Sequence, residues 1–192
     1  RTKKIMKMDE FEIISEKIAP YAKHVYLHKW GEPLMNKNIV KMITLVSKYA
    51  HPHLSTNGIL IDQKKAEQII TSGLGTMIIS IDGMSQEIYE KYRVKGKVDK
   101  VIENIKMLNE INKLYGKPVD ILPQMIAFKH NYSEIEEFKK FCENLDLKPI
   151  IKKPYIRFGA VEESGDPKYE RIKYDSKDLH LEAISKCSFA TN

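Results

Sequence analysis

A carboxylate between a glycine and a proline follows the first short apolar stretch of the chain, in the segment Trp30-Gly31-Glu32-Pro33. Gly31 permits a backbone conformation that lets the chain approach a ligand closely, and Pro33 stiffens the turn. In folds built on parallel strands, ligand sites are assembled at the carboxyl ends of the strands. Glu32 is therefore well placed to bind a cationic group. The alternative is an ordinary strand-to-helix turn with a solvated carboxylate.

Polar side chains recur at the ends of the next apolar stretches along the chain. Because the carboxyl ends of parallel strands share one rim, we expect these groups to form a single cup. Such a cup of hydrogen-bonding groups suits a polyhydroxylated, zwitterionic ligand. The residues concerned are Ser55 and Asn57 after the second stretch, Ser80 and Asp82 after the third, Gln124 and Asn131 in and after the fourth, and Arg157 near the last.

Other catalytic arrangements are absent from the sequence. It contains no P-loop, no GxGxxG and no defensible Ser/His/Asp set. His51 and His53 flank a proline at a metal-like spacing, but no third ligand is near them in sequence, so a pair at the entry to a strand is the better interpretation. His28 is a weak site candidate. Cys142 lies on an apolar helical stripe and is predicted to belong to the core.

The composition is that of one globular domain, with 192 residues, 42% hydrophobic and 30% charged. No apolar run reaches the roughly 18 residues that a membrane span needs, and no signal peptide is expected within these residues. Since the chain begins at Arg1 and not at Met, we expect it to be part of a longer product. Two cysteines far apart, Cys142 and Cys187, do not suggest a disulfide scaffold, so a cytoplasmic location is expected.

The net charge of +6 raises the question of a nucleic-acid partner. The lysines are scattered over predicted helix faces, and the tightest cluster, Lys152-Lys153 with Arg157, carries no nucleic-acid-binding motif. A solvated basic surface is therefore the favoured interpretation.

Helices and strands are predicted to alternate along the chain. Strands are expected at residues 24–28, 53–56, 75–81, 119–128 and 148–151, with a further strand or extension at 155–160. Helices are expected before and between these strands. The first has Asp9 as its N-cap with Phe11, Ile14 and Ile18 inward, and the second has an apolar stripe at 39–49. The later helices are indicated by N-caps at Asp62 and Ser85, an apolar stripe at 98–108, and a Ser133–Glu136 capping box.

This alternation predicts an α/β fold of parallel βαβ units with right-handed crossovers. Without a Rossmann glycine fingerprint, an open, barrel-like arc is favoured over a doubly wound sheet. The chain begins with a helix, so a strand before Arg1 would complete a six-fold β/α repeat. After Gly159 the apolar periodicity fades, and residues 161–192 are expected to form a linker or loop.

Four segments, in this order and spacing, resemble motifs of one known family. Trp30-Gly31-Glu32-Pro33 resembles its G-G-E-P motif, with Trp in place of the first Gly. Ser55-Thr56-Asn57-Gly58 resembles its "STNG" strand end, and Ser80-Ile81-Asp82-Gly83 resembles its "S-[IL]-D-G". Tyr92-Arg93, Gly96, Val101 and Asn104-Ile105 resemble the segment that follows. The family is that of the radical S-adenosylmethionine (SAM) enzymes, particularly the subgroup with a C-terminal SPASM or twitch extension.

The resemblance covers residues 8–159 and implies a partial (β/α)6, TIM-like barrel whose first strand is missing from this chain. It implies that the turn Gly31, Glu32 and Pro33 holds the methionine amino group of SAM. Ser80 and Asp82 would reach the ribose or the methionine carboxylate, and Arg93 would help with the carboxylate. Ser55 and Asn57 would belong to the same cofactor site, and Gln124, Asn131 and residues 156–159 would line the rim near ribose and adenine.

The resemblance also implies a [4Fe–4S] cluster that passes one electron to SAM, so that a 5′-deoxyadenosyl radical abstracts hydrogen from a substrate. The family holds this cluster with a C-x3-C-x2-C loop after its first strand, and the chain contains no such motif. We expect those cysteines upstream of Arg1. Cys187 stands where the first auxiliary-cluster ligand of an extension might be, with a free surface thiol as the alternative.

The implied activity is that of a radical SAM oxidoreductase or maturase acting on a peptide or small metabolite, with an electron donor such as flavodoxin or ferredoxin. Three alternatives stay open. One is a β/α-barrel lyase or aldolase with Glu32 or Asp82 as general base. Another is a barrel that binds SAM without cleaving it, and the third is a basic nucleic-acid-binding module.

Overall fold

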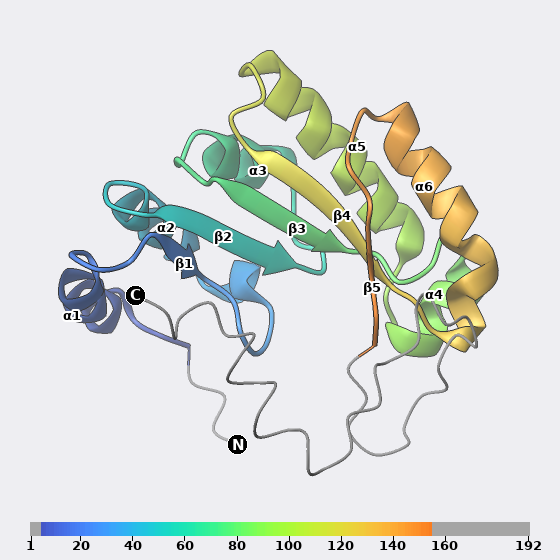
Figure 1. Ribbon diagram of the computed structural model, residues 1–192, viewed down its shortest axis with the longest axis horizontal. Helices are drawn as coiled ribbons and strands as arrows, with labels where there is room; N and C mark the ends of the chain where they lie inside the picture. Colours follow the sequence, from blue (N-terminus) through green and yellow to red (C-terminus); the bar gives the residue numbers. More distant parts are fainter. Residues whose placement is uncertain (1–4, 155–192) are drawn as a thin grey trace, which may run out of the picture.

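The computed structural model of the chain describes residues 5–154, and Figure 1 shows a curved sheet with helices packed on one of its faces. Five strands form this sheet in the order β1-β2-β3-β4-β5, and every neighbouring pair is parallel. The strands are β1 His24–Tyr26, β2 His51–Thr56, β3 Thr76–Ser80, β4 Asp120–Ile126 and β5 Ile150–Lys152. The predicted α/β fold of parallel βαβ units is confirmed.

One helix precedes the first strand, and the others connect successive strands. They are α1 Met8–Ile18, α2 Ile39–Val46, α3 Gln63–Ile70, α4 Gln86–Tyr92, α5 Val98–Leu114 and α6 Ile135–Asn144, with two 3-10 helices, η1 Pro33–Met35 and η2 Lys129–Glu134. Asp62 and Ser85 cap α3 and α4 as predicted, because their side-chain oxygens accept hydrogen bonds from the backbone N–H groups of Lys65 and Ile88. No helix of the described range is long and apolar enough to cross a membrane.

The core lies between the helices and one face of the sheet. Leu54 of β2 and Met77 and Ile79 of β3 are fully buried there. Ile105 of α5 and Phe138 of α6 cover them from the other side. Cys142 is buried in the same cluster, so its predicted place in the core is confirmed. These apolar contacts fix the strands and therefore the positions of their carboxyl ends.

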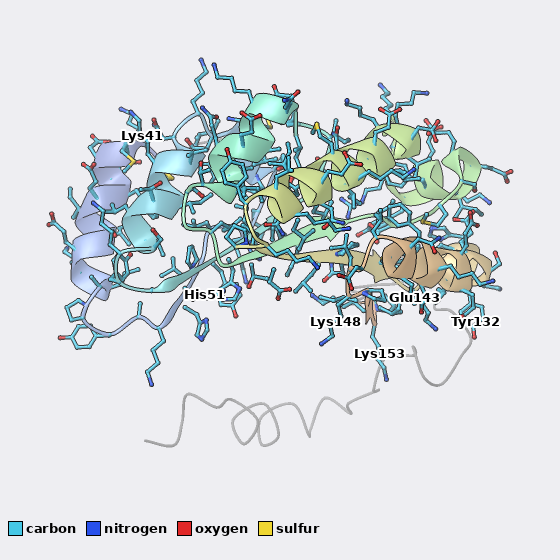
Figure 2. All side chains as sticks on the ribbon, turned by 90° about the horizontal axis from the view of Figure 1, so that it is seen from above. Lys41, His51, Tyr132, Glu143, Lys148 and Lys153 are labelled. Carbon is cyan, nitrogen blue, oxygen red and sulfur yellow. The ribbon has the colours of Figure 1, made fainter. Side chains whose placement is uncertain are left out.

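The opposite face of the sheet, here called the open face, carries the alternate residues of each strand. Strand alternation and the register place Tyr26, His53 and Thr76 in one row across β1, β2 and β3. Ser80 and Gln124 form a second row on β3 and β4, nearer the carboxyl ends. Figure 2 shows the helices on the other side of the sheet. A ligand can therefore reach this face without displacing a helix of the described range.

Two local predictions are wrong. Helix α1 begins at Met8 with Lys7 as its N-cap, so Asp9 is not the cap. Ile14 points outward at 41% exposure, whereas Ser15 is buried. The reason is tertiary, because the Ser15 hydroxyl lies 2.7 Å from the hydroxyl of Tyr49, which follows α2.

The predicted capping box of Ser133 and Glu136 is also absent. Helix α6 begins at Ile135, and its N-cap Glu134 makes no capping hydrogen bond with its side chain. The Glu134 carboxylate accepts hydrogen bonds from the backbone N–H groups of Met84 and Ser85 instead. A long-range contact has therefore replaced the local one that the sequence pattern suggested.

Candidate functional site

Glu32 is the N-cap of η1, immediately before Pro33 in the turn that follows β1. Its Oε1 accepts hydrogen bonds from the Leu34 N–H at 3.1 Å and from the Thr56 hydroxyl at 2.6 Å. Its Oε2 accepts one from the Asn57 N–H at 2.8 Å. A carboxylate has about four acceptor positions, so these three bonds hold the side chain in place and leave room for a further donor.

Gly31 gives this turn its shape through backbone conformation. Its φ of +85° lies in the left-handed region, and a Cβ built there would meet no atom within 4 Å. The open space at this position agrees with the predicted close approach of a ligand to the turn.

The end of β2 provides the groups that fix Glu32. Thr56 is buried on the helix side of the sheet, and its hydroxyl also accepts a hydrogen bond from the Gly58 N–H at 3.1 Å. The Asn57 side chain accepts one from the Ile59 N–H at 3.0 Å, which closes a tight turn. Thr56 is a residue that the sequence analysis missed. The alternation of β2 could have identified it, since Ser55 must face the opposite side.

Three polar side chains lie together on the open face near the carboxyl ends of β2, β3 and β4. They belong to Ser55, Ser80 and Gln124, and the last two are direct register partners. None of these side chains hydrogen-bonds to another residue of the described range. These polar groups can hydrogen-bond to a ligand with hydroxyl, amino or carboxylate groups.

Asp82 and Arg93, both predicted to contact the cofactor, are paired with each other. The Asp82 side chain is fully buried, and its Oδ2 accepts hydrogen bonds from Arg93 Nε at 2.7 Å and Nη2 at 2.6 Å. Its Oδ1 accepts the Ile126 N–H at 2.9 Å. Both oxygens of Asp82 thus have protein partners and its side chain is fully buried, so it holds Arg93 in place, and its predicted contact with the cofactor stays a prediction. Arg93 keeps 28% of its side chain exposed.

Asn131 is likewise fully buried, in the same network and away from the open face. Its Nδ2 donates to the carbonyl oxygens of Asp82 at 3.0 Å and Ile126 at 2.8 Å, and its Oδ1 accepts the Phe128 N–H at 2.8 Å. Asn131 therefore holds the ends of β3 and β4 together. The prediction that Asn131 lines the rim near ribose and adenine stays a prediction.

A cavity of about 190 Å³ brings Asn57 and Arg93 together. It is also lined by Ile59, Tyr89 and the loop 94–96. The Tyr89 hydroxyl is buried without a hydrogen-bond partner in the described range, and burial raises the pKa of this phenol. Tyr89 therefore stays a neutral donor at physiological pH.

The described residues contain no group of three or more His, Cys, Asp or Glu side chains placed to hold a metal ion. Cys142 is buried in apolar surroundings, and burial raises the pKa of its thiol to about 12. This thiol is therefore a poor ligand and nucleophile. Arg157 and Cys187, two further sequence candidates, lie outside the described residues.

The family profile of the Radical SAM superfamily matches residues 1–142 of the chain. The GTP 3',8-cyclase of Alkaliphilus oremlandii is 34% identical over 111 residues, which cover 56% of this chain and 33% of that protein. The probable GTP 3',8-cyclase of Methanocaldococcus jannaschii is 25% identical over 154 residues, or 74% of this chain and 50% of that protein. The chain therefore spans half or less of the length of these curated relatives.

Solved structures share the fold at low identity. Streptococcus suis SuiB bound to S-adenosylmethionine matches 94% of this chain and 40% of its own, with a TM-score of 0.66 and 19% identity. The enzyme anSMEcpe with bound AdoMet matches 88% of this chain and 49% of its own, with a TM-score of 0.64 and 18% identity. Each has also been solved with a peptide, SuiA or Kp18Cys. These likenesses confirm the predicted fold class, a partial barrel of parallel strands.

Proposed function

The chain belongs to the radical SAM superfamily, and from that premise we propose that it binds SAM on the open face of its sheet. In the complete protein, SAM and a [4Fe–4S] cluster are used to abstract a hydrogen atom from a peptide or small-metabolite substrate. The observation that carries this proposal is the row of unpartnered side chains of Ser55, Ser80 and Gln124 on the open face, together with the preorganised carboxylate of Glu32 in the turn after β1.

Glu32 would bind the methionine amino group of SAM. Its carboxylate already accepts hydrogen bonds from Leu34, Thr56 and Asn57, so it loses little conformational freedom when a ligand arrives. An ammonium group supplies the further donor that the remaining acceptor position can take. Gly31 and Pro33 contribute the shape of the turn.

Ser80 and Gln124 would contact the ribose and the edge of the adenine. Ser55, on the same face of the sheet, would contribute to the same site. Hydroxyl and amide side chains can each donate and accept hydrogen bonds, which matches the mixed hydroxyls and nitrogens of a nucleoside. Asn57 lines the cavity at Arg93 and would belong to the same site. These residues bind and orient the cofactor, while the cofactor carries the reaction itself.

Arg93 would bind the methionine carboxylate with the exposed part of its guanidinium. Asp82 accepts hydrogen bonds from Nε and Nη2, which fixes the plane of that guanidinium without covering all of it. We therefore assign a positioning role to Asp82 and Asn131 in place of direct contact.

When bound, the cluster and SAM supply a one-electron cleavage that yields a 5′-deoxyadenosyl group able to take hydrogen from carbon. We propose that residues 1–160 form the barrel core and residues 161–192 begin a SPASM or twitch extension, with Cys187 as a candidate auxiliary-cluster ligand. The main cluster ligands are proposed to lie before Arg1. The net charge of +6 suits an acidic electron donor such as flavodoxin or ferredoxin.

The substrate class stays broad in this proposal. Curated relatives are named for a GTP cyclisation, whereas structural neighbours have been solved with peptides. Both classes present a carbon-bound hydrogen to the same radical chemistry. Substrate choice would be made by rim loops and by parts of the protein beyond residues 5–154.

The proposal is tested with the full-length protein, reconstituted anaerobically with iron and sulfide and given SAM and a strong reductant. We expect 5′-deoxyadenosine to form, and calorimetry to show SAM binding that weakens in Ser80→Ala and Gln124→Ala. Ser133→Ala, at an exposed position of η2, is the matched control and should bind SAM normally. If SAM binds but no 5′-deoxyadenosine forms with the cluster fully occupied, the protein is a non-catalytic SAM binder. If SAM does not bind, the proposal fails.

A further inference from the structure

Histidines from two neighbouring strands gather on the open face of the sheet, at the amino ends of β1 and β2. His24 and His51 are register partners, as are Tyr26 and His53. Figure 2 shows His51 on the side of the sheet away from the helices. This cluster lies at the end of the strands opposite to the proposed SAM site. The proposed function leaves it unused.

Two imidazoles of the cluster point ring nitrogens at each other. His24 Nδ1 lies 3.0 Å from His53 Nε2. The His51 ring is 4.6 Å from that of His53, but its Nε2 faces the Thr76 hydroxyl at 2.9 Å. Tyr26 stacks on His53 with ring centroids 4.5 Å apart and restricts the rotation of that imidazole.

The separation of these two nitrogens matches a pair of neighbouring metal ligands. With metal–nitrogen bonds of about 2.0–2.1 Å, two ligands at a right angle lie roughly 2.9 Å apart, and two tetrahedral ligands roughly 3.3 Å apart. The observed 3.0 Å is compatible with two neighbouring ligands of one ion and equally with a hydrogen bond between the two rings. His24 is exposed, so an ion has a path to the pair.

The donor set defines the chemical class of the ion. Imidazole suits Cu²⁺, Ni²⁺ and Zn²⁺, whereas Mg²⁺ and Ca²⁺ require oxygen ligands. Because no three-residue metal group exists within residues 5–154, this part of the chain would supply two ligands and water the others.

We propose that His24 and His53 form a two-histidine site for a divalent transition-metal ion, which links β1 to β2. Strand β1 has only three residues, and its described sheet contacts are with β2 alone. An ion shared by these strands would stabilise the folded chain by mass action. The inference stands whether or not the protein cleaves SAM.

Titration of the full-length, cluster-reconstituted protein with Ni²⁺ at pH 7.5 tests this site by calorimetry. We expect the wild-type protein to bind one Ni²⁺ ion at this site. His24→Gln and His53→Gln should each lower the affinity for Ni²⁺ at least about tenfold, because even groups that only hydrogen-bond to a metal ligand change metal affinity by about ten- to a hundredfold. His130→Gln, which changes a histidine of η2 outside the cluster, is the control and should bind as wild type does. Ni²⁺ should raise the melting temperature of the wild-type protein, and this rise should vanish with EDTA and in the His24→Gln and His53→Gln variants.

A second measurement needs no variant. Ni²⁺ should protect His24 and His53 of the wild-type protein from diethylpyrocarbonate, as mapped by mass spectrometry, and leave His130 unprotected. The inference is overturned if wild type and both Gln variants bind Ni²⁺ equally, or if Ni²⁺ protects neither histidine. The pair would then be a hydrogen bond between two imidazoles and nothing more.

Discussion

The hydroxyl of Thr56 donates a hydrogen bond of 2.6 Å to Glu32, a residue 24 positions earlier in the chain. This bond joins the turn after β1 to the end of β2. The same hydroxyl accepts the Gly58 N–H at 3.1 Å, so one buried side chain serves both segments. The proposed amino-group site thus depends on a residue that itself faces away from the ligand.

We predict that Thr56→Val lowers the stability of the protein and its affinity for SAM. Valine keeps the shape of the side chain but removes a hydrogen bond to a charged group and the acceptor of a buried N–H. The expected loss in the free energy of unfolding is about 2 kcal/mol. Chemical denaturation and SAM calorimetry on the full-length protein measure the two effects.

Thr44→Val is the matched control, because the Thr44 hydroxyl donates only to the Val40 carbonyl on an exposed part of α2. It should change stability by less than about 0.5 kcal/mol and leave SAM binding unchanged. Equal losses in the two variants would contradict a specific role for Thr56.

The pairing of Asp82 with Arg93 leads to a second prediction. Asp82→Asn keeps the side-chain volume and can still accept the Ile126 N–H, but it removes the charge that faces the guanidinium. We expect a loss of about 3 kcal/mol in the free energy of unfolding, the lower end of the range for a broken buried pair, because Arg93 is partly exposed. SAM affinity should fall as well.

Asp146→Asn provides the comparison, since Asp146 pairs with Lys117 on an exposed surface. Solvent screens that pair, so little change in stability is expected. If Asp82→Asn unfolds at the same denaturant concentration as wild type, the Asp82–Arg93 pair does not support the site as argued.

The order of the elements could be predicted because buried parallel strands appear as apolar runs and helices as apolar stripes. Glu32, Ser55, Ser80 and Gln124 were found by one rule, that polar groups at successive strand ends share a rim. The structure keeps Ser55, Ser80 and Gln124 on the open face and Glu32 in the adjoining turn. Periodicity and topology were sufficient to place these residues at the strand ends, and their role in a ligand site stays a prediction.

Residues with distant partners could not be predicted in the same way. Asp82 follows β3 and Asn131 lies in η2 after β4, and both make hydrogen bonds to distant parts of the chain, Asp82 with the Ile126 N–H and Asn131 with the Asp82 carbonyl oxygen. Glu134 similarly accepts a hydrogen bond from the N–H of Ser85, the N-cap of α4, which lies 49 residues earlier in the chain, and the expected capping box does not form. Local sequence spacing contains no information about such partners.

The loop that forms the cavity at Arg93 gives a third prediction. A Cβ added at Gly96 would lie 2.6 Å from Cε1 of the Tyr89 ring and 2.9 Å from the Arg93 carbonyl oxygen. Gly96→Ala should therefore displace the loop and lower stability by about 1–3 kcal/mol. Lys97→Ala, the exposed neighbouring position, should be nearly neutral in the same denaturation experiment. An unchanged Gly96→Ala variant would show that the loop does not pack on Tyr89.

The buried thiol of Cys142 predicts a loss of stability at alkaline pH. Burial, helped by the charge of Glu143, raises the pKa of this thiol from 9.0 to about 12. Above pH 9 the unfolded chain releases the proton that the folded chain retains, so the unfolded state gains stability as the pH rises. The contribution of the Cys142 thiol to the free energy of unfolding is fully present below pH 9 and is lost progressively as the pH rises toward 12.

Comparison with Cys142→Ala isolates this effect from other groups that titrate in alkali. Wild type should be the more stable protein at pH 8, and its advantage should shrink by up to about 1.4 kcal/mol per pH unit above pH 9. Peptide mapping after iodoacetamide at pH 8 should find Cys142 unmodified in the folded protein and modified in urea. The prediction is contradicted if the difference in free energy of unfolding between the two proteins stays constant up to pH 11, or if iodoacetamide rapidly alkylates the folded chain. Either result would mean that water reaches the thiol and that α6 does not exclude solvent from the core at this position.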